Sequence, residues 1–221
     1  DVHKINKNII MQTKITYRPE IDGLRAIAVF AVIFYHSEAE LFDHNFFPGG
    51  FIGVDIFFVI SGYLITSLIL KELTFNKSFS FLNFYERRIR RIIPALLIVI
   101  IFSLPIAWLY LLPLDLIEYS KSILYSLGFS SNYFFYLADI EYNAQDSLLT
   151  PFLHTWSLSV EEQYYIIFPI FLIVIFKFLK KYLLFILSIV LLASVTLASI
   201  TAPENFSLNF YSIQTRMWQL I

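Results

Sequence analysis

The sequence contains no cysteine and little charge. Without cysteine, disulfides and thiolate metal sites are excluded. Only 15% of the 221 residues are Asp, Glu, Lys or Arg, and the formal net charge of −1 points to no nucleic-acid partner. The first basic residues are followed by no small-residue cleavage site. We therefore expect no cleavable signal peptide and a first apolar segment that stays as a helix.

Apolar residues are abundant instead. They make up 58% of the chain, and the mean hydropathy is +0.69, both well above the values of soluble domains. The 24 Phe and 14 Tyr are too many for one interfacial belt, so aromatic rings must also face lipid or fill the interior. This composition predicts an all-α fold, a polytopic transmembrane helical bundle.

Five stretches are long and apolar enough to cross a bilayer, and a sixth is indicated near Tyr211, so we expect about five to six spans. The five stretches cover residues 21–37, 51–70, 92–112, 160–179 and 183–200. The segment 116–137 is ambiguous, because it contains Glu118, Lys121, several serines and Asn132.

Lysine and arginine occur in alternate connections between these stretches. They precede the first stretch, cluster between the second and third, and follow the fourth, whereas none occur between the first and second stretches or in 138–159. The positive-inside rule then predicts that residues 1–20 form a cytoplasmic N-terminal segment. The alternation holds only if 116–137 does not cross the membrane. We therefore expect 116–137 to be a re-entrant or interfacial segment, and irregular membrane backbone is tolerated where it is buried in protein or lines a cavity.

Two ionisable residues stand near the ends of the first apolar stretch. Arg25 lies near its start and His36 at its end, roughly 16 Å apart on a helix. Charged groups in a membrane segment are costly and usually functional. The pair therefore indicates one site within the membrane, with its two groups at different depths. The alternative is an interfacial histidine and an arginine whose side chain extends to the membrane surface.

Four arginines, at positions 87, 88, 90 and 91, precede the third stretch. Residues spaced i and i+3 share one helical face. Arg88 with Arg91, and Arg87 with Arg90, would therefore present paired guanidinium forks suited to phosphate. Basic clusters at membrane ends are also common topology anchors and contacts for anionic lipid, and the residues alone leave this alternative open.

A polar group opens the fourth stretch, and its members are His154, Trp156, Ser157, Glu161 and Glu162. Ser157 and Glu161 stand at i and i+4 on one helical face. A carboxylate near an imidazole would orient the ring and raise its basicity. Alternatively, Ser157 or Ser159 caps the helix and an acid stabilises its first turn.

Asp55 lies one turn inside the second apolar stretch, near Gly53 and Gly62, which permit close helix approach. We expect its partner to be Arg25 or His36; the alternative is an interfacial carboxylate in a tight helix pair. The predicted topology places His36, Asp55 and the 154–162 group on the outer side of the membrane, and the arginines on the cytoplasmic side.

Together these stretches resemble the acyltransferase-3 family of integral-membrane O-acyltransferases, from about residue 17 to residue 221. The resemblance is carried by DGLRA at 22–26 with YH at 35–36, GVDIFFVISG at 53–62, RRIRRIIP at 87–94, HTWSLSVEEQ at 154–163 and QTRMWQL at 214–220. Any one motif is weak, but all of them in this order are specific.

The resemblance implies transfer of an acyl group, usually acetyl, from cytoplasmic acyl-CoA to a hydroxyl of a cell-envelope glycan. It implies that His36 is catalytic with Arg25 as its partner. It also implies that the paired arginines, chiefly Arg88 and Arg91 with Arg87 and Arg90 beside them, bind acyl-CoA.

Further roles follow from the same resemblance. Ser157 and Glu161 match the family's serine and glutamate pair at the outer side. We expect Glu161, Glu162 or Asp55 to stabilise the imidazolium that forms on His36. We expect Ser157, His154 and Trp156 to contact the acceptor.

Acyl-CoA is then a substrate, with no permanently bound cofactor and no metal, and the expected partners are membrane lipid and an envelope glycan. The expected location is the bacterial cytoplasmic membrane. Since the family usually has about ten spans, we expect residues 21–221 to be the N-terminal half of the membrane domain. The acceptor (lipopolysaccharide O-antigen, exopolysaccharide or peptidoglycan), the acyl chain and the oligomeric state stay open.

Two other functions compete with this one. A transporter or flippase of glycan precursors would line its path with buried Arg and His, but it predicts internal repeats, and the sequence shows none. A non-catalytic membrane scaffold predicts loss of His36 or of the arginine pair, and both are present.

Overall fold

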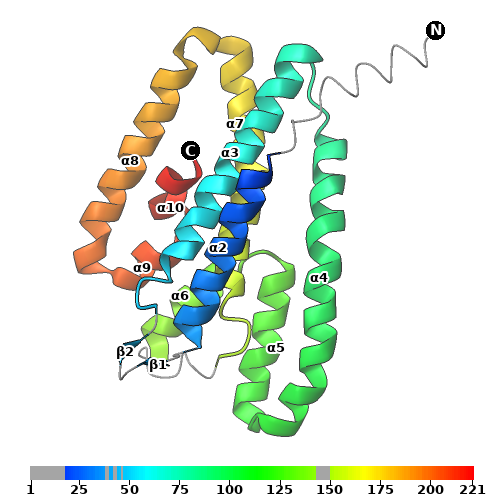
Figure 1. Ribbon diagram of the computed structural model, residues 1–221, viewed down its shortest axis with the longest axis vertical. Helices are drawn as coiled ribbons and strands as arrows, with labels where there is room; N and C mark the ends of the chain where they lie inside the picture. Colours follow the sequence, from blue (N-terminus) through cyan, green and yellow to red (C-terminus); the bar gives the residue numbers. More distant parts are fainter. Residues whose placement is uncertain (1–17, 38–39, 42–43, 46, 143–149) are drawn as a thin grey trace, which may run out of the picture. The chain divides into compact units, whose positions relative to one another are not determined.

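The computed structural model describes residues 18–37, 40–41, 44–45, 47–142 and 150–221, and they are almost entirely helical (Figure 1). The chain divides into two compact units. The first comprises Asp1–Ser78, Tyr165–Thr196 and Arg216–Ile221, and the second comprises Phe79–Tyr164 and Leu197–Thr215. Most of the predicted cytoplasmic segment 1–20 lies outside the described residues.

The first unit is built around helices α2 (Pro19–His36) and α3 (Ile52–Phe75). The two-residue strands β1 (Glu40–Leu41) and β2 (His44–Asn45) pair antiparallel between these helices. The later part of α7 (Thr155–Phe178), η2 (Lys180–Tyr182), most of α8 (Leu183–Glu204) and the end of α10 (Ile213–Leu220) complete the unit. Pro19 opens α2 at a position that proline tolerates. The carboxylates of Glu20 and Asp22 in its first turn interact favourably with the positive end of the helix dipole.

Small residues let α2 and α3 approach closely, as the sequence predicts. A Cβ at Gly53 would lie 2.5 Å from the Ala28 carbonyl oxygen, and a Cβ at Gly50 would collide with the Ala31 carbonyl oxygen. Farther along α3, a Cβ at Gly62 would collide with the carbonyl oxygen of Leu220 in α10. Helix α3 therefore contacts two neighbours through backbone atoms, α2 near its start and α10 farther along.

Replacing Gly53 by alanine should destabilise the full-length protein by about 1–3 kcal/mol, because the added methyl overpacks the α2–α3 contact. Gly23 is the matched control, since a Cβ there would have nothing within 4 Å. Gly23→Ala should be neutral or stabilising. The measurement is the midpoint of thermal unfolding in detergent, and equal midpoints for the two variants would contradict the close packing.

The second unit contains α4 (Phe81–Tyr110), α5 (Pro113–Leu127) and α6 (Ser131–Tyr142). The first turns of α7, the end of α8, α9 (Phe206–Tyr211) and the start of α10 belong to it as well. The Ser80 hydroxyl caps α4 by accepting a hydrogen bond from the Asn83 amide at 3.4 Å.

The predicted helical membrane bundle is confirmed. Four of the described helices are long and apolar enough to cross a membrane: Ile52–Phe75, Phe81–Tyr110, Thr155–Phe178 and Lys180–Glu204. They contain the last four predicted spans, except for a residue or two at some ends. The first predicted span forms α2, which is not among the four because Glu20, Asp22 and Arg25 lie within its length. The predicted sixth span corresponds to the short helix α10.

Two helices begin before the apolar stretches that were predicted to cross the membrane. Helix α4 begins at Phe81, ahead of the apolar stretch 92–112, so the arginines at 87–91 lie inside the helix, as their predicted helical pairing requires. Helix α7 begins at Thr155, so Ser157 and Ser159 do not cap it and the two glutamates lie beyond its first turn. In both cases the residues before the apolar stretch mix apolar and polar side chains, and hydropathy marks only the continuously apolar part of a helix that extends beyond it.

The predicted re-entrant segment 116–137 forms a helical hairpin from α5 and α6. Both helices are shorter than the roughly 20 residues that a crossing requires. The turn between them passes through Phe129, whose φ of 51° lies in the left-handed region. Whether this hairpin is re-entrant or interfacial stays a prediction.

Candidate active site

In the first unit, His36 ends α2 and is exposed. Its Nδ1 lies 2.9 Å from the Val32 carbonyl oxygen. A carbonyl only accepts, so Nδ1 carries the proton in the neutral ring and the lone pair is on Nε2. The Tyr35 ring lies edge-on to the imidazole, with 5.1 Å between ring centroids. The orientation therefore suits Nε2 for accepting a proton.

Arg25, the predicted partner of His36, pairs with Asp22 one turn earlier on α2, with 3.5 Å between Nη1 and Oδ1. About a quarter of its side chain is exposed. The ion pair holds the guanidinium on the face of α2 that also carries Asp22.

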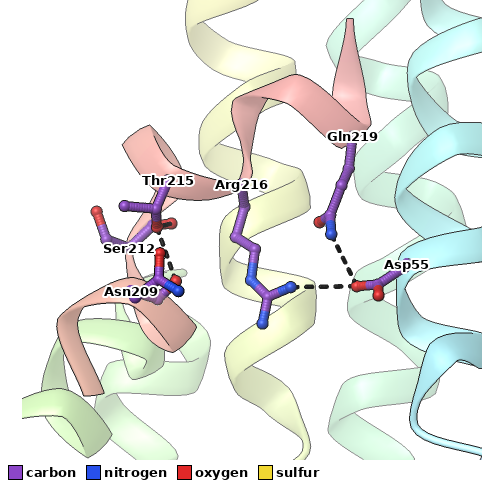
Figure 2. A network of polar contacts seen from close by, with 6 residues as sticks. All are labelled: Asp55, Asn209, Ser212, Thr215, Arg216 and Gln219. Carbon is purple, nitrogen blue, oxygen red and sulfur yellow. Dashed lines mark hydrogen bonds and ion pairs between the residues drawn. The ribbon is translucent and has the colours of Figure 1, made fainter. Parts of the chain in front are cut away.

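Asp55 has different partners from those predicted. Figure 2 shows Arg216 and Gln219 of α10 pointing at its carboxylate. Arg216 Nη1 and Gln219 Nε2 both donate to Asp55 Oδ1, at 3.2 and 2.9 Å. The prediction of Arg25 or His36 is wrong, because Gly53 faces α2 and Asp55 is two residues farther on, about 200° around the helix.

The contact between α3 and α10 extends along one face. Asp55 and Gly62 stand at i and i+7 on α3, and Gly62 abuts the Leu220 carbonyl. On its other side, α10 is bonded to α8, because the Trp218 amide donates to the Ser194 hydroxyl at 3.0 Å. Residues 216–220 of the QTRMWQL stretch therefore work as a structural connector within the first unit, a role that the sequence did not indicate.

In the second unit, the arginines of α4 separate into two groups. Arg90 is largely exposed and pairs with Glu86 at 2.7 Å, and Arg87 is also exposed. Arg88 is half-buried, with its guanidinium 5.7 Å from the centre of the Phe84 ring. Arg91 is exposed, yet both Arg88 and Arg91 act electrostatically on Glu162 of α7.

The sequence analysis predicts that the arginines and the glutamates lie on opposite sides of the membrane, and this placement stays a prediction. Arg88 and Glu162 each lie about 10 Å inside their own helix, because α4 and α7 begin before their apolar stretches. Within the second unit, the electrostatic interaction of Arg88 and Arg91 with Glu162 makes these groups one polar region.

The remaining predicted residues lie in or just before the first turns of α7. Trp156 is buried against Phe210 and Tyr211, with ring centroids 4.5 and 5.7 Å away. The Ser157 hydroxyl donates to the His154 carbonyl at 3.2 Å, and the His154 side chain is exposed. Trp156 thus packs inside the second unit, whereas His154 is exposed and Ser157 is half-buried.

A buried hydroxyl cluster joins the α5–α6 hairpin to α7. The Thr155 hydroxyl lies 2.8 Å from that of Ser126 and 2.9 Å from that of Ser131. Ser131 in turn lies 2.7 Å from the Ser159 hydroxyl. Three of these side chains, those of Ser126, Ser131 and Ser159, are at most 1% exposed. The serines in the ambiguous segment were the only sequence signal for this cluster.

An amide pair continues the same junction. Gln163 Nε2 donates to Asn132 Oδ1 and to the Phe129 carbonyl, both at 2.8 Å, and Asn132 Nδ2 donates to the Tyr211 carbonyl at 3.0 Å. Gln163 therefore secures the left-handed turn of the hairpin against the helix that carries Glu161 and Glu162.

Gln163→Leu should destabilise the full-length protein by about 1–3 kcal/mol, because the Oδ1 of buried Asn132 and the Phe129 carbonyl lose the hydrogen bonds that Gln163 donates. Thr196→Val is the control, since the exposed Thr196 hydroxyl bonds only to Leu192 of its own helix among the described contacts. Thermal unfolding in detergent measures both, and a Gln163→Leu midpoint no lower than that of the control would contradict the role of the amide pair.

Comparison with known proteins gives a consistent set of matches. A family model described as an acyltransferase domain matches residues 18–219. A Staphylococcus aureus protein named "Putative O-acetyltransferase" is 40% identical over 79% of this chain and 28% of its own length. A peptidoglycan O-acetyltransferase of Listeria monocytogenes is 38% identical over 93% of this chain and 33% of its own length. The chain thus spans about a third of these relatives. No solved structure matches it significantly.

Proposed function

Because the chain belongs to the acyltransferase-3 family, we propose that it is the part of a membrane O-acetyltransferase that moves acetyl from acetyl-CoA to a hydroxyl of a cell-envelope glycan. The observation that carries this proposal is the family match over residues 18–219, which includes every predicted site residue. Peptidoglycan is the first acceptor to test, since the Listeria relative is named for it.

The proposed reaction uses His36 as the general base. Nε2 takes the proton of the acceptor hydroxyl as its oxygen attacks the thioester carbonyl carbon. The tetrahedral intermediate then expels the CoA thiolate, which receives the proton from the imidazolium. Atoms and charge balance, and the products are the acetyl ester and CoA. Arg25 would stabilise the developing oxyanion or hold the CoA arm.

The donor site in this proposal is the polar region of the second unit. Arg88 and Arg91 would bind the phosphates of CoA, because guanidinium groups match phosphate geometry. Arg90 is paired with Glu86, and we assign Arg87 and Arg90 the long-range attraction of the nucleotide. Acetyl-CoA is a substrate here, and the proposal includes no resident cofactor.

The proposed location is the bacterial cytoplasmic membrane, with the N-terminus in the cytoplasm. The basic connections support this orientation through the positive-inside rule.

The test uses membranes that contain the full-length protein, supplied with acetyl-radiolabelled acetyl-CoA and purified peptidoglycan. We expect label in the glycan that mild alkali releases as acetate, and none in membranes that lack the protein. Label retained on lipid or protein alone would contradict transfer to the glycan, and no label anywhere would contradict the enzyme.

A further inference from the structure

Three side chains bond one face of α7 to the α5–α6 hairpin. Thr155, Ser159 and Gln163 stand at i, i+4 and i+8, so they share that face. The Thr155 hydroxyl lies 2.8 Å from that of Ser126 in α5 and 2.9 Å from that of Ser131 in α6. Ser159 accepts a hydrogen bond from the Ser131 amide at 3.2 Å, and the two hydroxyls lie 2.7 Å apart. All five residues belong to the second unit, so the contact lies within one compact unit.

Ser157 and Glu161 lie on the opposite face of the same helix. Each residue of an α-helix is rotated by about 100° from the one before, so Ser157 is about 200° from Thr155, and Glu161 is about 200° from Ser159. Both are half-buried, whereas Ser159 is only 1% exposed. The direction in which Ser157 and Glu161 point therefore depends on the rotation of α7 about its own axis.

In a membrane protein, hydrogen bonds fix the rotation of a helix better than apolar packing does. Lipid chains are as apolar as leucine, so an apolar helix face gains little from one particular orientation. Hydroxyl bonds are directional, and a rotated α7 would leave buried hydroxyls without partners. Each such bond contributes only modestly to stability in a membrane. The cluster therefore acts mainly on the orientation of α7.

We infer that Thr155 and Ser159 are positioning residues for the acceptor glycan. Their bonds to the hairpin fix the rotation of α7, which directs Ser157 toward the hydroxyl that receives the acetyl group. The donor arginines lie on a different helix, α4, so donor binding should not depend on these bonds. The inference rests on the proposed function, since it takes Ser157 as a contact of the acceptor.

The test is the steady-state kinetics of the purified full-length protein in detergent, with acetyl-CoA and soluble peptidoglycan fragments as substrates. Thr155→Val keeps the shape of the side chain and removes the hydroxyl, so kcat/KM for the glycan should fall about tenfold through misplacement of the acceptor. The KM for acetyl-CoA should stay unchanged. Thr155→Ser restores the hydroxyl and should return kcat/KM for the glycan to near the wild-type value.

Ser122→Ala is the matched control. Ser122 belongs to the same hairpin and is 1% exposed, but among the described contacts its hydroxyl bonds only to the Tyr119 carbonyl of its own helix. Its loss should leave the kinetics with both substrates unchanged. Ser159→Ala is the second variant if Thr155→Val does not fold, and it should also lower kcat/KM for the glycan alone.

Wild-type glycan kinetics in a folded Thr155→Val or Ser159→Ala protein overturn the inference while the proposed function stands. A parallel loss with both substrates and a lower unfolding midpoint also overturns it, because that pattern indicates a purely structural cluster. Failure of both variants to fold has the same meaning. Wild-type protein that transfers no acetyl to the glycan overturns both the inference and the proposed function.

Discussion

Replacing His36 by alanine should lower the rate of acetyl transfer by about 100- to 10,000-fold, the contribution typical of a general base. The ring is exposed at the end of α2, and its Nδ1 bond to the Val32 carbonyl aligns Nε2 as the proton acceptor. Removing an exposed ring leaves the α2–α3 packing intact, so the loss should fall on kcat and leave the CoA affinity unchanged.

The matched control is Ser37→Ala. Ser37 is the next residue, is equally exposed, and donates a hydrogen bond to the Phe34 carbonyl. Its loss should change neither kcat nor stability appreciably. Steady-state transfer by the purified full-length protein measures both variants. A His36→Ala enzyme with more than about a tenth of wild-type kcat would rule out His36 as the base.

Replacing Arg216 by alanine should destabilise the protein by on the order of 3 kcal/mol, because it leaves Asp55 without its charged partner in the apolar contact between α3 and α10. Lys121→Ala is the control. Lys121 pairs with Glu118 at 2.7 Å on an exposed face, and such pairs contribute at most about 1 kcal/mol. Thermal unfolding of both variants in detergent measures the difference.

The double variant Asp55→Asn with Arg216→Gln separates two roles of Asp55. It removes both charges and keeps groups that can hydrogen-bond, so stability should return to near the wild-type value. If activity returns as well, Asp55 only positions α10 against α3. If stability returns and activity does not, Asp55 also acts in the chemistry, as the sequence analysis proposed. A double variant no more stable than Arg216→Ala would contradict the ion-pair account.

The predicted spans were largely right, because hydropathy is a local property of the sequence. A stretch of about 20 apolar residues is enough to predict a membrane-spanning helix without knowledge of its neighbours. Helix starts were harder to predict. The start of α4 is stabilised by the Ser80 cap, and the start of α7 carries hydroxyls that bond to a hairpin distant in sequence. Neither leaves a hydropathy signal.

Partners distant in sequence were the main failure. Arg216 lies far along the chain from Asp55, and nothing in the composition near either residue pairs them. Hydropathy also did not show that Arg88 and Glu162 lie two turns inside their helices, because both are in the polar parts that precede the apolar stretches. Gly53 and Gly62 were read correctly, since small residues in apolar helices have few other uses.

The most direct test of the central claim is the O-acetyl content of the envelope glycans, measured by mass spectrometry. A deletion strain is complemented with the full-length wild-type gene or with its His36→Ala variant, at equal protein levels. We predict that the wild type restores the acetyl esters and that His36→Ala does not. Restoration by both would contradict the role of His36, and no change in any acyl ester with either would contradict the acetyltransferase itself.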